Sequence, residues 1–155
     1  MVLSEGEPAP PFEALDQDGE TVSSAALSGK RFVLYFYPRD GTTICTREAC
    51  SFEADRPEFE ALDVPVIGVS PNRVSSHKRF AEKHGLGFRL LADPERDIIG
   101  KYDAKGLFGR TTRVTYIIGA DMRIEAVHRS EISGSGHVKW AKNTLRLLEK
   151  PAEAQ

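Results

Sequence analysis

The stretch Arg31-Phe-Val-Leu-Tyr-Phe-Tyr-Pro38, followed at once by Arg39-Asp-Gly-Thr-Thr-Ile-Cys45, decides the fold of this chain. Its first part is an unbroken run of apolar and aromatic residues, which is typical of a strand buried on both faces of a sheet. Pro38 ends this strand, and the three residues after it form a loop. Two threonines then offer hydroxyl caps for a helix over residues 43–55. We therefore expect a buried strand, a short loop and a helix whose first turn carries Cys45.

Outside this stretch, apolar periodicity and turn residues predict the other elements. Strands are expected at 12–15, 21–22, 64–70, 90–91, 113–118 and 124–127, and helices at 57–62, 74–84, 94–99 and 137–148. The first two strands flank Asp18-Gly19, a dipeptide that suits a tight hairpin turn. Strands that alternate with helices, followed by a terminal hairpin and helix, predict an α/β fold with a mixed central sheet and helices on both faces. We expect a thioredoxin-like fold with an N-terminal β-hairpin extension.

Length and composition indicate one globular domain over residues 1–155. Hydrophobic residues make up 40% of the chain, and the formal net charge of −2 gives no reason to expect nucleic acid or an anionic membrane as a partner. No apolar run approaches the roughly 18 residues that a membrane span needs. The first seven residues are acidic and lack the basic start and apolar stretch of a signal peptide, so we expect a cytoplasmic protein.

The chain has two cysteines, Cys45 and Cys50, which are too few for a disulfide framework. In a reducing compartment, a closely spaced pair is more often catalytic or metal-binding than structural. An unperturbed thiol is only about 3% ionised at pH 7, yet the thiolate is the nucleophile. Amides at the helix N-terminus favour a thiolate at Cys45, and Arg113, at the start of a predicted central strand, is placed to add a positive charge. Cys45 is therefore the candidate nucleophile.

The spacing between Cys45 and Cys50 has a mechanical consequence. On an ideal helix, Cα atoms five residues apart are about 8.6 Å apart, and their side chains point roughly 140° away from each other. A disulfide needs Cα atoms within about 7 Å. One helix can therefore hold both reduced cysteines, but a bond between them requires the first turns to unwind. We predict a redox-driven local unfolding over residues 43–52.

Two residues before Cys45 have candidate roles in the same pocket. Thr42, three residues earlier, places a hydroxyl beside the sulfur, where it can cap the helix, contact a substrate, or do both. Pro38 is expected to shape the loop and to shield the pocket from water.

The charged candidates have competing interpretations. Arg113 is preferred to Arg110 as the partner of the sulfur because it abuts the strand, although a surface or salt-bridge role for it stays open. Glu48 is interpreted as a helix cap or a surface charge rather than a catalytic acid. The four histidines lack a close pair at i, i+4, and Cys-x4-Cys is not a common zinc arrangement, so we expect no metal site.

Together these residues resemble the peroxiredoxin family. The stretch Pro38-Arg-Asp-Gly-Thr-Thr-Ile-Cys45 matches its signature of Pro, three residues, Thr, two residues and Cys. The stretch Cys45-Thr-Arg-Glu-Ala-Cys50 is similar to the atypical two-cysteine subfamily named for bacterioferritin comigratory protein, also called the Q type. Similar segments span most of the chain, at 6–12, 18–19, 29–30, 34–38 and 113–118. One departure is Thr43-Ile44, where the family usually has Pro-Gly.

The resemblance implies a thioredoxin-dependent peroxidase that reduces hydrogen peroxide and organic hydroperoxides, in antioxidant defence and redox homeostasis. It implies that Cys45 is peroxidatic and that Cys50 resolves the sulfenic acid as an internal Cys45–Cys50 disulfide. Thr42 and Arg113 are implied as activators of sulfur and peroxide, and Pro38 as the shield. The resemblance further implies no metal or organic cofactor, a thioredoxin-like dithiol protein as reductant, and a monomer.

Two other functions use the same residue types. A thiol–disulfide oxidoreductase shares the predicted fold, but such proteins need Cys-x-x-Cys, and their relatives have a proline where Thr112 precedes Arg113. A non-enzymatic redox sensor or holdase would react once per reduction, whereas a peroxidase cycles with its reductant. Insulin reduction and multiple turnover separate these possibilities.

Overall fold

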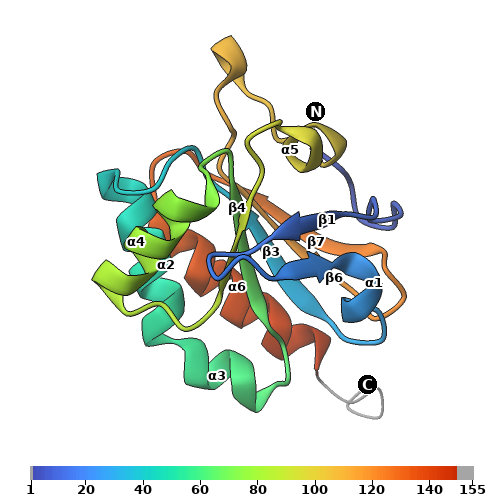
Figure 1. The fold of residues 1–155 in the computed structure, drawn as a ribbon. Coiled ribbons are helices and arrows are strands. Elements are labelled where there is room, and N and C mark those ends of the chain that lie inside the picture. The colour runs from blue at the N-terminus through green and yellow to red at the C-terminus, as the bar shows by residue number, and fades with distance from the viewer. Residues whose placement is uncertain (1, 150–155) are drawn as a thin grey trace.

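The apolar run after Arg31 forms the central strand of the sheet in a computed structural model that describes residues 2–149. The strand order is β5-β4-β3-β6-β7 (Figure 1). The strands are β3 (Phe32–Phe36), β4 (Val66–Ser70), β5 (Arg89–Ala92), β6 (Val114–Ile118) and β7 (Ile124–Arg129). Because β3, β4 and β5 run parallel while β6 and β7 pair antiparallel, the sheet is mixed, as predicted.

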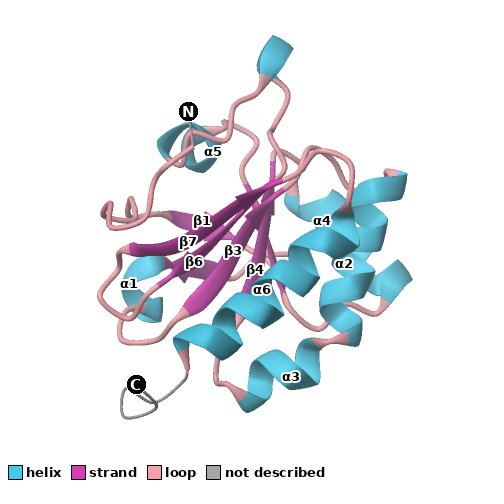
Figure 2. Ribbon diagram, turned by 180° about the vertical axis from the view of Figure 1, so that it is seen from behind, coloured by secondary structure: helices cyan, strands magenta, loops and turns pink. Residues whose placement is uncertain are grey.

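Helices cover both faces of this sheet (Figure 2). One face carries α2 (Thr43–Ala54), α3 (Arg56–Ala61), α4 (Val74–His84) and α6 (Gly134–Leu148). The other face carries α1 (Ser24–Leu27), α5 (Asp97–Lys101) and the hairpin of β1 (Glu13–Leu15) with β2 (Thr21–Ser23). The predicted thioredoxin-like fold with an N-terminal hairpin is therefore confirmed.

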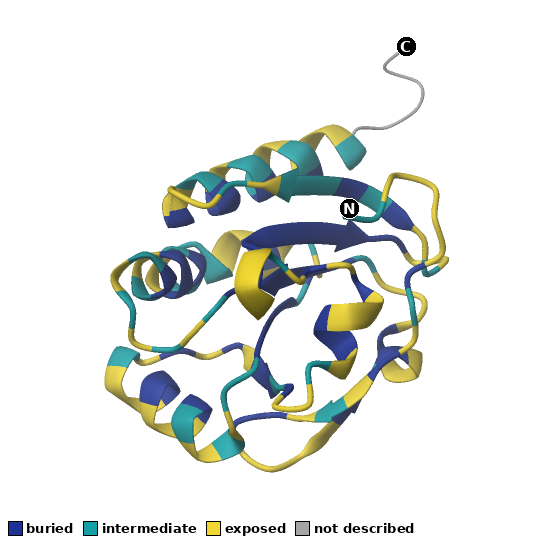
Figure 3. Cartoon of the chain, turned by 90° about the horizontal axis from the view of Figure 1, so that it is seen from above, coloured by how far each residue is buried: buried dark blue, intermediate teal, exposed yellow. Residues whose placement is uncertain are grey.

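The side chains on the two faces of β3 pack into two separate apolar cores. Tyr35 belongs to the core beneath α2 and α6, whereas Leu34 belongs to the core beneath α5 and the hairpin. All five residues of β3 are buried, as expected from a run without polar alternation. Figure 3 shows the same division, with buried residues on the sheet and on the helix sides that face it. A sheet buried on both sides leaves its carboxyl edge as the place for chemistry.

Two helices begin three residues away from the predicted position. The last helix was expected from His137 but begins at Gly134, because Ser133 accepts a hydrogen bond from the Gly136 N–H at 3.0 Å and caps it. The short helix expected from Pro94 begins at Asp97. Its first turn is capped by Asp93, whose carboxylate accepts the amides of residues 97 and 99 at 3.0 and 2.8 Å.

Other differences are small. The short helix α1 was not predicted, and neither was a 3-10 helix, Leu107–Gly109, in the loop between α5 and β6. Within residues 2–149, no helix has the length and apolar character needed to cross a lipid bilayer.

Candidate active site

Strand pairing brings the candidate residues to one edge of the sheet. β3 ends at Phe36, and the loop after it leads into α2, which carries Cys45 near its start. The antiparallel register pairs Phe36 with Val114, so Arg113, directly before Val114, lies at the same edge. Two segments 68 residues apart in the chain therefore meet at the first turn of α2.

Cys45 is a buried thiol held against a guanidinium. Only 1% of Cys45 is exposed, and Nη1 of Arg113 donates a hydrogen bond to its Sγ at 3.0 Å. Cys50 lies on the same helix but is exposed, and both cysteines are free. The helix therefore holds the two sulfurs in different surroundings, one enclosed and one accessible to a protein partner.

Arg113 is itself almost completely buried, with 2% of its side chain exposed. A buried cation is costly unless an anion or strong acceptors compensate it. Nη1 of Arg113 lies 3.0 Å from the sulfur of Cys45 and 3.9 Å from a carboxyl oxygen of Glu48. Arg110, the alternative considered from the sequence, is exposed. The arrangement places a buried cation directly against the sulfur.

The interpretation of Glu48 as a cap or surface charge was wrong. Its side chain is 0% exposed, and neither carboxyl oxygen has a hydrogen-bond partner among the described residues. Burial raises the pKa of Glu48 well above its ordinary value, and the attraction of Arg113 opposes this shift without reversing it. Glu48 is therefore a buried carboxyl group with a raised pKa beside the arginine, three residues after Cys45 and on the same side of α2.

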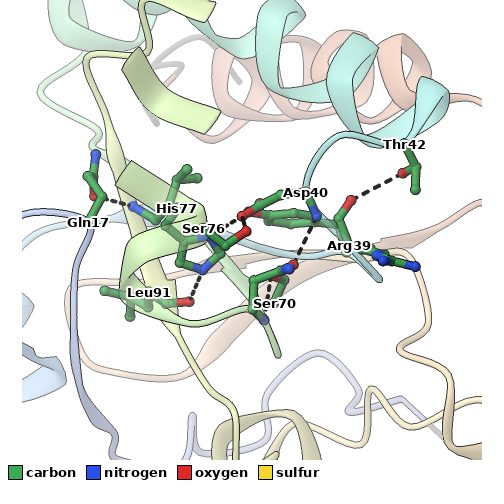
Figure 4. Close-up of polar contacts among 11 residues, drawn as sticks. Gln17, Arg39, Asp40, Thr42, Ser70, Ser76, His77 and Leu91 are labelled. Carbon is green, nitrogen blue, oxygen red and sulfur yellow. Dashed lines mark hydrogen bonds and ion pairs between the residues drawn. The ribbon is translucent and has the colours of Figure 1, made fainter. Parts of the chain in front are cut away.

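Thr42 occupies the N-cap position of α2, but its hydroxyl does not cap the helix. The hydroxyl donates to the carbonyl of Arg39 at 3.1 Å instead, so the helix-cap alternative for Thr42 is wrong (Figure 4). This hydrogen bond joins two residues of the loop between β3 and α2. Pro38 lies half-buried at the start of that loop, directly after the last buried residue of the strand segment.

His137 from α6 completes the buried surroundings of Glu48, and its role was not predicted from the sequence. Thr115 donates its hydroxyl proton to Nδ1 at 2.8 Å, while Nε2 donates to the carbonyl of Ser130 at 2.9 Å. Burial lowers the pKa of His137 to about 4, so the ring is neutral near pH 7. Its Nδ1 lies 3.9 Å from Glu48 Oε2. Residues three apart in a helix lie on the same side, so the sequence could have placed Glu48 near Cys45. No sequence feature near His137 indicates that it joins them.

These features define a class of protein. A thioredoxin-like fold presents a buried thiol at a helix start, an arginine on its sulfur and a second thiol five residues further on. Such a site suits nucleophilic sulfur chemistry in which the thiolate is stabilised by a cation and by helix amides. The class is that of thiol-dependent redox enzymes.

Proteins of similar sequence and structure identify the family. The family model described as "AhpC/TSA family" matches residues 6–127. Peroxiredoxin Bcp of Bacillus subtilis is 38% identical over 157 residues, covering 97% of this chain and 99% of that protein. The chloroplastic peroxiredoxin Q of Populus jackii is 34% identical over 149 residues, covering 95% of this chain and 68% of that protein. The crystal structure of peroxidoxin BcpB from Mycobacterium tuberculosis matches with a TM-score of 0.89 and 31% identity, covering 96% and 99% of the two chains.

The chain therefore belongs to the AhpC/TSA family, as a peroxiredoxin similar to the Bcp and Q-type proteins. It is a thiol-dependent peroxidase.

Proposed function

We propose that this peroxidase works by a two-cysteine cycle in which Cys45 is the peroxidatic residue and Cys50 the resolving residue. The observation that carries the proposal is the 3.0 Å contact from Arg113 Nη1 to the buried Cys45 Sγ. A guanidinium and the N-terminal amides of α2 both favour the thiolate, which is the reactive form. The substrates are hydrogen peroxide and organic hydroperoxides, and the cellular role is antioxidant defence.

The first step is a displacement at oxygen. The Cys45 thiolate attacks the terminal peroxide oxygen, the O–O bond breaks, and the sulfur becomes a sulfenic acid. The leaving oxygen takes up a proton and departs as water or an alcohol. Arg113 and Thr42 stabilise charge on the oxygens during displacement, and Pro38 shields the pocket. The first-turn placement of Cys45 and the burial of Arg113 support the role of the arginine.

The second step forms the Cys45–Cys50 disulfide and releases water. α2 is continuous from Thr43 to Ala54, with Cys45 buried and Cys50 exposed. Helical geometry keeps the two Cα atoms about 8.6 Å apart, beyond disulfide reach, so the first turns of α2 must unwind. Amide-exchange protection over residues 43–52 should therefore be lower in the oxidised protein than in the reduced one, and identical protection would refute the unwinding.

A thioredoxin-like dithiol protein reduces the disulfide by exchange. The exposed position of Cys50 supports access by such a partner. We further propose that the enzyme acts as a monomer in the cytoplasm, where a free cysteine pair is maintained by the reducing environment. Size-exclusion chromatography with light scattering tests the oligomeric state.

Peroxide consumption coupled to thioredoxin tests the cycle. We expect turnover in the wild type and none in Cys45→Ser. Cys50→Ser should consume one equivalent of peroxide and then stall or over-oxidise. Equal turnover in the wild type and Cys45→Ser would reject the assignment. Strong insulin reduction with negligible peroxide consumption would indicate a thiol–disulfide oxidoreductase instead.

A further inference from the structure

A buried pair of charged side chains ties the loop between β3 and α2 to helix α4. Asp40 lies in this loop, and His77 lies in α4 with its Nδ1 2.7 Å from Asp40 Oδ2 (Figure 4). The side chain of His77 is 0% exposed and that of Asp40 is 6% exposed. The two-cysteine cycle gives neither residue a role, so the burial of this pair needs another explanation.

The hydrogen-bond partners of His77 define its protonation state. Nε2 faces the carbonyl oxygen of Leu91 at 2.9 Å, and a carbonyl only accepts, so Nε2 carries a proton. Nδ1 faces the carboxylate of Asp40. That carboxylate also accepts the hydroxyls of Tyr37 at 2.6 Å and Ser76 at 2.8 Å, and these donors favour its ionised form. Both ring nitrogens of His77 therefore face acceptors, and this geometry assigns the ring as an imidazolium.

The titration of Asp40 agrees with this assignment. Burial opposes its ionisation, but hydrogen bonds from His77, Tyr37 and Ser76 outweigh burial and bring the pKa of Asp40 below its ordinary value. The groups that face the imidazole are the Asp40 carboxylate, the Leu91 carbonyl and the Tyr37 ring, whose centroid is 6.3 Å away. The two opposite charges therefore compensate each other in the interior.

The same loop is also held through its backbone. The N–H of Asp40 donates to Asn72 Oδ1 at 2.9 Å, and this oxygen also accepts the hydroxyl of Ser70 at 2.8 Å. Next to Asp40, the carbonyl of Arg39 accepts the hydroxyl of Thr42 at 3.1 Å. Anchoring Asp40 therefore places Thr42, the residue from which α2 begins.

We propose that the His77–Asp40 pair is a positioning device that fixes the loop over residues 38–42 and thereby the start of α2 around Cys45. The proposal rests on the proposed role of Cys45. The proposed cycle unwinds the first turns of α2, directly after the loop that carries Pro38 and Thr42. The contacts of Asp40 with Asn72 and with α4 lie outside α2, so unwinding of α2 leaves them intact.

Nitrogen-15 NMR of the imidazole rings at pH 7, in the wild-type protein and in Asp40→Asn, tests the pair. We expect both ring nitrogens of His77 to be protonated, and only one in Asp40→Asn, because an amide can donate to Nδ1. A neutral His77 in the wild type would overturn the proposal. This measurement does not involve Cys45, so failure of the proposed function and failure of this inference are separate results.

Two matched variants test the positioning role. His77→Asn keeps a donor near Asp40 and loses the bond to Leu91, whereas His77→Gln keeps the bond to Leu91 and loses the donor to Asp40. We expect His77→Gln to lower the rate constant of Cys45 oxidation about tenfold and His77→Asn to lower it less than about threefold, since small displacements of reacting groups cost this much. If His77 only stabilises the fold, the rate constant of Cys45 oxidation in each variant should fall in proportion to that variant's loss of thermal stability. Equal rates in the two variants would overturn the proposal.

Discussion

Arg113 Nη1 lies 3.0 Å from Cys45 Sγ, although 68 residues separate the two in the chain. The contact forms because β6 pairs antiparallel with β3 and so begins at the edge where α2 begins. The arginine is buried, so its charge acts on the sulfur with little screening by water. The reactivity of the Cys45 thiol therefore depends on the register between β3 and β6, which places Arg113 beside it. Variants at Arg113 test this dependence.

Replacing Arg113 should slow the reaction of Cys45 with peroxide. Arg113→Met removes the charge and the donors, and we expect the second-order rate constant to fall by about 10² to 10³, the usual loss when a donor to a developing charge is removed. Stopped-flow measurement of a single turnover gives this constant. Arg110→Met is the matched control, since Arg110 is exposed, and it should leave the rate unchanged. Comparable losses in both variants would contradict the assignment.

Glu48 should make the protein less stable as the pH rises. Burial raises the pKa of Glu48 well above its ordinary value of 4.5, so the folded state keeps a proton that the unfolded state releases. The contribution of Glu48 to the unfolding free energy must then fall as the pH rises through 4.5. Glu48→Gln mimics the neutral acid without this titration, so its stability advantage over the wild type should grow from pH 4 to pH 7. Urea unfolding across that range checks the prediction, with the exposed Glu82→Gln as control.

An advantage of Glu48→Gln that stays constant with pH would show that the carboxyl group ionises normally in the folded protein.

Tyr35 and Tyr37 should respond oppositely to loss of their hydroxyls. Their rings stack with centroids 5.4 Å apart, and both side chains are buried. The Tyr37 hydroxyl donates to Asp40, whereas the Tyr35 hydroxyl has no hydrogen-bond partner among the described residues. We expect Tyr37→Phe to cost about 1–3 kcal/mol and Tyr35→Phe to be neutral or stabilising by up to about 1 kcal/mol. Thermal unfolding followed by circular dichroism measures both, and destabilisation of equal size would contradict the prediction.

Gly134 should be intolerant of any side chain, because α6 packs its first turn directly on α2. A Cβ at Gly134 would lie 2.7 Å from the carbonyl oxygen of Ile44 and 2.9 Å from the backbone nitrogen of Glu48. Backbone atoms cannot move aside cheaply, so we expect Gly134→Ala to cost about 1–3 kcal/mol. Amide exchange should rise in the first turn of α2. Ser135→Ala, at an exposed neighbouring position, is the control and should leave exchange in α2 unaltered.

The local features of the site could be predicted from the sequence because they depend on adjacent residues. The apolar run of β3 and the cysteine after it place Cys45 at a helix start, and the beginning of the next central strand indicates Arg113. The burial of Glu48 could not be predicted in this way. It depends on α6, which packs against α2 from far along the chain and brings Gly134 and His137 to the same place.

The Asp40–His77 pair could not be predicted from the sequence for a related reason. The two residues lie 37 positions apart, and the helical spacing of His77 with Phe80 and Ala81 indicates only that it faces the core. Its partner comes from a loop whose path depends on the ends of two other elements. Helical periodicity identifies which face of a helix is buried, but it does not indicate which polar group that face will contact.

The rate constant of the Cys50→Ser variant with hydrogen peroxide at pH 7, in a single turnover with the sulfenic acid trapped, tests the central claim most directly. A thiolate held by Arg113 should react with one equivalent of peroxide at least about 10³ times faster than free cysteine, the size of effect that charge stabilisation at a reacting centre provides. A rate equal to that of free cysteine would show that Cys45 is an ordinary buried thiol.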